Sequence, residues 1–146
     1  MEKSCCFFGH RDTPENIKPK LTEAITKLSD EIGISHFYVC KQGDFESLVI
    51  SILKELAVSN PKIRYSIVLA YLPAEHSAVC DENTLYPEGM ESVPKRFCIA
   101  RRNDWMIDHS KYVDIEKIRQ SFVNKKFFIQ NKENLQYYFQ TLHIII

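Results

Sequence analysis

The sequence predicts an α/β domain with a Rossmann-like, three-layer architecture and a mostly parallel sheet. Over residues 4–70, short apolar runs alternate with amphipathic helical stretches in the order strand, helix, strand, helix, strand. Strands that are joined by helical crossovers run parallel and carry helices on the faces of their sheet. A length of 146 residues is typical of one domain with a sizeable core, so we expect a single domain over 1–146.

The first strand is predicted for the apolar run at residues 5–8. A helix should follow over 14–32, because apolar residues recur there at every third or fourth position. Thr13 is a candidate N-cap, Pro14 suits the first helical position, and Gly33 is a fitting stop.

A second strand is expected at His36–Cys40, followed by a tight turn at 41–44 and a helix whose apolar face extends over 45–56. Tyr65–Ala70 is predicted as the third strand. Residues 71–90 have the composition of a long irregular loop, a type of segment that is often functional.

The next helix should open at Ser92 or Val93, with Pro94 at its start. The signal weakens beyond it. The pattern there suggests a strand that starts at Tyr112-Val113, a helix over 114–121, a short strand at 127–129, a terminal helix over 131–142 and an apolar tail at 143–146.

The charge and the hydropathy of the sequence argue against two classes of partner, nucleic acids and membranes. Lys and Arg together number 19, as do Asp and Glu, which argues against nucleic acid as a partner. The sequence contains no apolar stretch long enough to cross a bilayer and does not begin with a signal-peptide pattern. We therefore expect a cytoplasmic protein without a membrane partner.

The cysteines and histidines do not predict a metal site. The five cysteines include no C-x-x-C pair, which favours buried free thiols over a zinc site. The adjacent Cys5 and Cys6 should point to opposite faces of their strand. No metal and no cofactor are expected, since no metal-ligand spacing relates the histidines that we examined, His36, His76, His109 and His143.

Three loops should meet at one edge of the sheet, because parallel strands end together: 9–12, 41–44 and 71–90. His10 and Arg11 in the first loop suit an anion such as phosphate, although solvated loop residues would look the same. Gly43 in the second loop would let the backbone approach a ligand closely at a helix N-terminus, but a plain strand-to-helix turn explains a glycine at this position equally well.

Two further groups are candidates for the same edge. Glu46 lies in the first helical turn, where the dipole favours a carboxylate whatever its function; it could also accept hydrogen bonds from ribose or act as a general base. Arg102, followed by Asn103, could turn inward and pair with a carboxylate or a phosphate. Trp105 and Met106 are expected in the core.

The chain resembles the SLOG superfamily, in its small, largely uncharacterised bacterial and phage branch. The resemblance covers 1–113, while 114–146 is diverged. The segments that carry it are Cys5–Arg11, Phe37–Val39, Gln42–Glu46, Val68–Pro73, Tyr86–Gly89, Val93–Phe97 and Arg102–Met106.

The resemblance implies a Rossmann-like fold with a pocket for a nucleotide or nucleotide-derived ligand at the strand ends. Some relatives cleave nucleoside monophosphates, and others are thought to sense nucleotide signals or to bind single-stranded DNA. The residues that match the ligand loops are Gly9, His10, Arg11, Gln42, Gly43, Glu46, Arg102 and Asn103.

The departures from the family pattern affect the function. Relatives usually carry glycine at the position of Cys40 and aspartate at that of Glu46. They also continue into a Gly-Gly phosphate loop, whereas this chain has 114–119 and no glycine after Gly89. Loss of these backbone donors favours binding or sensing over catalysis.

Three functions remain open. The first is binding or sensing of a nucleotide-like small molecule. The second is a nucleotide hydrolase of the phosphoribohydrolase type, with Glu46 as catalytic carboxylate. The third is a degenerate, non-catalytic interaction domain, possible as a homo-oligomer, that uses the C-terminal aromatic residues Phe127, Phe128, Tyr137, Tyr138 and Phe139.

Overall fold

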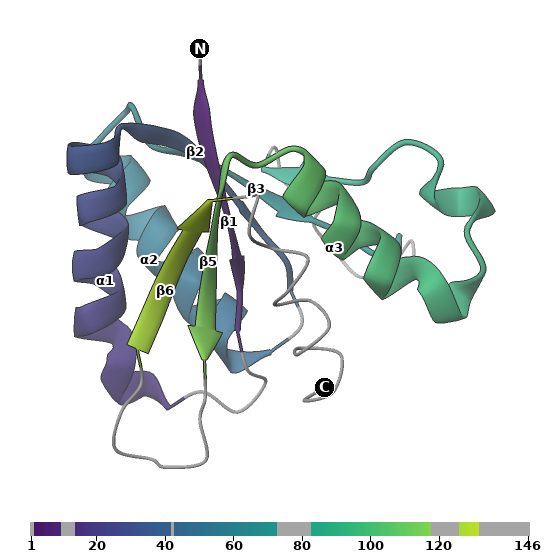
Figure 1. The fold of residues 1–146 in the computed structure, drawn as a ribbon, viewed down its shortest axis with the longest axis horizontal. Coiled ribbons are helices and arrows are strands. Elements are labelled where there is room, and N and C mark those ends of the chain that lie inside the picture. The colour runs from purple at the N-terminus through teal and green to yellow at the C-terminus, as the bar shows by residue number, and fades with distance from the viewer. Residues whose placement is uncertain (1, 10–13, 42, 73–82, 118–125, 132–146) are drawn as a thin grey trace.

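The computed structural model describes residues 2–9, 14–41, 43–72, 83–117 and 126–131. Within these ranges one sheet contains six strands in the order β4-β3-β2-β1-β5-β6 (Figure 1). The strands are β1 (Lys3–Phe8), β2 (Ile34–Val39), β3 (Arg64–Val68), β4 (Thr84–Leu85), β5 (Tyr112–Lys117) and β6 (Lys126–Asn131).

The sheet is mostly parallel, as the alternation of strands and helices predicts. β1 pairs in parallel with both β2 and β5, β2 with β3, and β3 with β4, whereas β6 runs antiparallel to β5. The chain moves outward from β1 to β3 on one side and returns to β5 on the other. The carboxyl end of β1 therefore lies at the point where the strand order reverses, which is where open α/β sheets bind ligands.

Three α-helices connect and cover these strands: α1 (Lys18–Lys27), α2 (Asp44–Ser59) and α3 (Cys98–Asp108). α1 is extended by a 3₁₀ turn at Glu15–Ile17 and by a π-helical turn at Leu28–Ile32. Gly33 then ends the helical segment with φ of 81°, the left-handed conformation that glycine adopts without strain.

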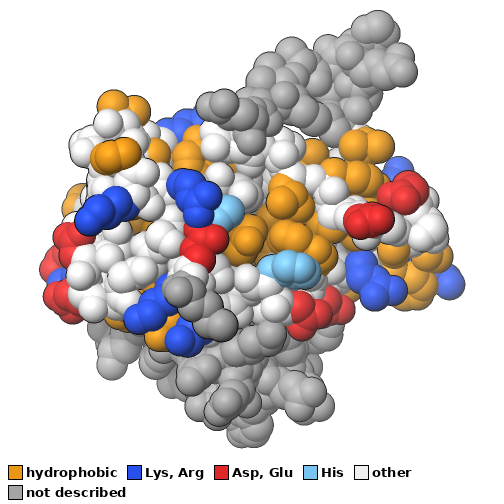
Figure 2. All heavy atoms as spheres, turned by 90° about the horizontal axis from the view of Figure 1, so that it is seen from above, with side chains coloured by type: hydrophobic (Ala, Val, Ile, Leu, Met, Phe, Trp, Pro, Cys, Tyr) orange, Lys and Arg blue, Asp and Glu red, His pale blue; other side chains and the backbone are white. Residues whose placement is uncertain are grey.

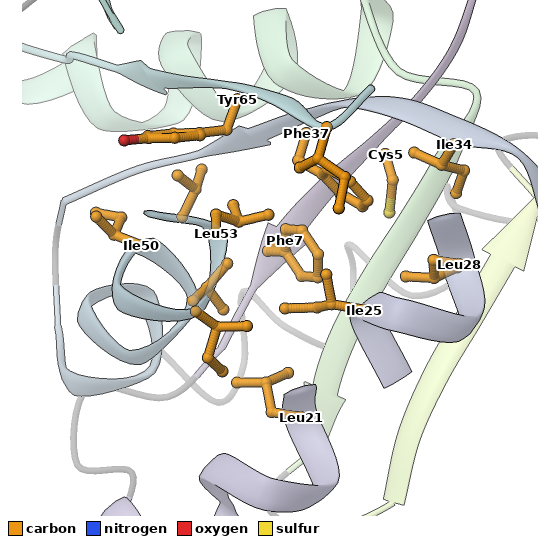
Figure 3. Packing of buried hydrophobic residues seen from close by; sticks show 14 of the residues in the cluster. Cys5, Phe7, Leu21, Ile25, Leu28, Ile34, Phe37, Ile50, Leu53 and Tyr65 are labelled. Carbon is orange, nitrogen blue, oxygen red and sulfur yellow. The ribbon is translucent and has the colours of Figure 1, made fainter. Parts of the chain in front are cut away.

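The helices lie on two faces of the sheet and so give the predicted three layers. α1 and α2 cover one face, where Phe7, Leu21, Ile25 and Leu53 pack together (Figure 3). α3 covers the other face, where its Met106 packs in a second cluster. The neighbouring residues Cys5 and Cys6 belong to the first and the second cluster respectively, as their alternation along β1 requires.

The helix predicted over 114–121 is wrong as far as the structure describes this segment. Residues 112–117 form β5, which pairs with β1 on one side and with β6 on the other. The period-two alternation of Val113, Asp114, Ile115 and Glu116 is compatible with a strand, and pairing on both edges satisfies its backbone groups.

The structure also corrects two predicted helix starts, each of which involves a proline. Pro14 has extended backbone with ψ of 146° and precedes the first helical residue, Glu15. Likewise, the third helix does not open at Ser92 or Val93. The backbone is extended at Val93 because a following proline disfavours helical geometry, and a 3₁₀ turn then leads into α3 at Cys98.

Of the other elements predicted after residue 70, some are confirmed and some lie outside the described residues. The strand predicted at 127–129 is confirmed as part of β6, and two residues of the segment predicted as a loop over 71–90 form the short strand β4. The terminal helix, apart from Asn131 at the end of β6, and the apolar tail lie outside the described residues. Among those that are described, no helix is both long and apolar enough to cross a membrane.

Candidate functional site

The carboxyl end of β1 lies directly beside the N-terminus of α2. Gly9 follows the last residue of β1, and a Cβ atom placed on it would overlap the side chain of Phe45, the second residue of α2. Phe45 is fully buried in the core beneath the sheet. The first residue of the loop predicted at 9–12 is thus in contact with the helix that follows the loop predicted at 41–44.

Glu46 is the buried acid of this edge. Its side chain is 5% exposed, and the thiol of Cys40 donates to its Oε1 over 3.7 Å. Its Oε2 is also buried and has no hydrogen-bond partner in the described part of the chain. Burial raises the pKa of this carboxyl, an effect that is partly offset by its own backbone N–H, by Cys40, by the backbone of Gly9 and by the charge of Arg102.

Cys40, the residue that follows β2, acts here as a hydrogen-bond donor. Burial raises the pKa of its thiol to about 12, against the opposing charge of Arg102 and with further help from Glu46. A thiol with this pKa stays protonated at neutral pH, so it is a poor nucleophile. Its role in the site is to hold one oxygen of Glu46.

Arg102 contributes a buried positive charge from α3. Its side chain is 2% exposed, and its Nε and Nη2 both donate to Asn103 Oδ1, over 3.2 and 3.0 Å. The expected pairing with a carboxylate is not found among the described residues, where the partner of Arg102 is a neutral amide. Its charge nevertheless acts on both Cys40 and Glu46.

The predicted site residues divide into three groups. Gly9, Glu46 and Arg102 meet at the carboxyl edge, and Asn103 joins them through Arg102. Gly43 caps α2 with extended backbone that any residue adopts, and its carbonyl accepts hydrogen bonds from Ser47. The others, His10, Arg11 and Gln42, lie outside the described residues.

Cys40 is the site residue that sequence reasoning missed, since the pattern of cysteines indicates only a small buried hydrophobe there. Its position offered a signal: it follows β2 directly and precedes Glu46 by six residues, on the strand-to-helix turn itself. A polarisable donor in that place lies within reach of the first turn of the next helix.

Figure 2 shows the opposite, amino edge of the sheet, where hydrophobic side chains lie beside histidine side chains. Stacked ring pairs lie there, with His36 on Tyr38 at 4.6 Å and His109 on Trp105 at 3.9 Å between ring centroids. An open hollow of about 510 Å³ lies beside them. Its lining residues are His36, Lys54, Ala57, Val58, Ile63, Arg64, Tyr65 and Asn83.

The hollow is a weaker candidate than the carboxyl edge. Its ion pair between Arg64 and Glu2 is solvent-exposed, and His36 already bonds Ser66 Oγ over 2.8 Å. The carboxyl edge instead contains the buried Glu46, whose Oε2 has no hydrogen-bond partner among the described residues, and the buried Arg102, whose guanidinium donates to the amide of Asn103. Buried polar groups with unmet hydrogen bonds are the more specific sign of a ligand site.

No model of a known protein family matches the chain, and no curated protein matches it.

Proposed function

We propose that the carboxyl edge of the sheet binds a small anionic ligand of the nucleotide type, and that the chain is a binding or sensing domain of SLOG character. The observation that carries the proposal is the buried Glu46, whose Oε2 has no hydrogen-bond partner among the described residues and whose carboxyl lies within the electrostatic reach of Arg102. Glu46 lies in the first turn of α2, next to Phe45, which contacts Gly9 at the carboxyl end of β1, where the strand order reverses.

Each group has a distinct role in this proposal. Arg102 attracts the phosphate, and the sequence offers Arg11, which lies outside the described residues, as a second cation for it. The N-terminus of α2 adds the positive end of a helix of 16 residues, which favours a negative charge. Glu46 accepts a hydrogen bond from a ribose hydroxyl, the kind of donor that its free oxygen needs.

One observation favours a second function, hydrolysis of a nucleotide. Burial raises the pKa of Glu46, and a raised pKa suits a carboxyl that transfers a proton near neutral pH. Binding remains the preferred function because the chain has no glycine after Gly89 to build a second phosphate loop.

The binding proposal is tested by calorimetry with ribonucleoside mono- and diphosphates and ADP-ribose. Loss of a charge-assisted hydrogen bond costs about 1.5–3 kcal/mol, so Arg102→Gln should weaken binding roughly 10- to 150-fold. Arg101→Gln is the matched control, because Arg101 is an exposed cation on the same helix. Absence of affinity for every compound would remove the proposal.

The hydrolase alternative needs its own assay. Release of free base from nucleoside monophosphates that disappears in Glu46→Gln, while nucleotide binding persists, would favour catalysis. Binding without base release would favour sensing.

A further inference from the structure

We propose that Asn103 is a positioning residue that keeps the guanidinium of Arg102 away from the carboxyl of Glu46, so that both groups remain available to one ligand. The inference deepens the proposed function and rests on it. It assigns to Asn103 an action through Arg102 in place of direct ligand contact.

The first support is the absence of an ion pair where one would be expected. The side chains of Glu46 and Arg102 are only 5% and 2% exposed, and the charge of Arg102 is felt at Glu46. Even so, the two are not among the ion pairs that join described residues. Two buried opposite charges gain by contact, and a lone buried carboxylate oxygen is costly.

The second support is the geometry that holds Arg102. Two N–H groups, on Nε and Nη2, converge on the single Oδ1 atom of Asn103. Donation from both fixes the plane and direction of the guanidinium. The amide is neutral, so it orients Arg102 without cancelling its charge. A carboxylate at this position would hold the same geometry and remove the charge.

The two separated groups define the chemistry of the ligand. Oε2 of Glu46 needs an O–H or N–H donor, and the guanidinium needs an anionic oxygen. A molecule that satisfies both carries a phosphate and a hydroxyl or amino group, as a phosphorylated sugar does. Inorganic phosphate and an uncharged nucleoside each meet only one requirement, and both should bind more weakly than adenosine 5′-monophosphate.

Two variants of Asn103 separate positioning from a purely structural role. In Asn103→Ala, Arg102 is released and pairs with Glu46, so the pKa of Glu46 should fall. In Asn103→Asp, Arg102 stays oriented but neutralised, so the pKa of Glu46 should rise. Both variants should bind adenosine 5′-monophosphate at least about tenfold more weakly.

The pKa of Glu46 is measured on the full chain by NMR titration of its side-chain carboxyl carbon, with Asp104→Asn as the control at the exposed neighbour. Opposite shifts in the two variants support the inference. An unchanged Glu46 pKa in both folded variants, or shifts of the same sign, would overturn it. Because the titration needs no ligand, wild-type protein that binds no nucleotide removes the proposed function while the shifts still decide the positioning role.

Discussion

Gly9 at the exit of β1 lies against Phe45 in the first turn of α2, so closely that no side chain fits between them. This contact joins the strand that carries the first candidate loop to the helix that carries Glu46. The glycine is required here by space, and its replacement has a definite cost.

We expect Gly9→Ala to lower the free energy of unfolding by about 1–3 kcal/mol, because the added methyl overpacks against the Phe45 ring. Urea denaturation measures the loss. Phe45→Leu in the same chain should relieve part of it, so a double-mutant cycle should give a clear coupling energy. Strictly additive effects would show that the two residues are not in contact.

Glu46→Gln should stabilise the protein at neutral pH. Since burial raises the pKa of Glu46, the folded state favours the protonated carboxyl, and its stabilising effect is complete below the unfolded pKa near 4.5. This effect is lost as the pH rises through the folded pKa. The gain from the substitution should therefore be large at pH 7 and vanish near pH 4, as followed by thermal denaturation.

The control for this experiment is Glu55→Gln on the same helix. The side chain of Glu55 is 64% exposed and pairs with Lys18 at the surface. Surface ion pairs contribute roughly 0–1 kcal/mol, so this variant should change stability little at either pH. Destabilisation by Glu46→Gln at pH 7 would contradict the penalty that burial places on the charged form of Glu46.

The Cys40 thiol should tune the acidity of Glu46 through its hydrogen bond to Oε1. Cys40→Ala removes the donor, and the pKa of Glu46 should rise further. Cys40→Ser supplies a hydroxyl donor of nearly the same size, and the pKa should be lower than in the alanine variant. NMR titration checks both; equal Glu46 pKa values in the two variants would exclude a functional hydrogen bond.

Burial of His36 should lower the stability of the protein at acidic pH, whereas burial of Glu46 lowers it at neutral pH. Burial lowers the pKa of His36 below 6.5, so the folded state favours the neutral ring. Its contribution to stability is present above pH 6.5 and is lost as the pH falls through the folded pKa. His36→Gln should flatten the stability profile on the acid side of pH 6.5, as followed by thermal denaturation. A parallel loss in the wild type and the His36 variant would contradict this origin.

The local patterns predicted most of the fold. Apolar spacing identified the helical segment that ends at Gly33, and alternation along β1 placed Cys5 and Cys6 on opposite faces. The interpretation failed where tertiary pairing decides the outcome. Three of the residues 114–117 are charged, which favours a helix, but neighbouring strands on both sides satisfy the backbone groups of this segment as a strand.

The candidate site was predictable only in part. Parallel strands place loops at one edge by topology, which is why Gly9 and Glu46 could be expected together. The burial of Glu46, its thiol partner Cys40 and the attachment of Arg102 to Asn103 depend on how α3 packs across the sheet. A single sequence carries no periodic signal for contacts of this kind.

Trp105 is the one tryptophan of the chain and lies three residues beyond Arg102 on α3. Its indole stacks on His109 and meets the ring of Tyr38 edge-on at 5.5 Å, so it joins α3 to β2. The fluorescence of Trp105 therefore reports on the position of α3. Any shift of α3 that accompanies ligand binding at the carboxyl edge of the sheet changes the surroundings of this indole.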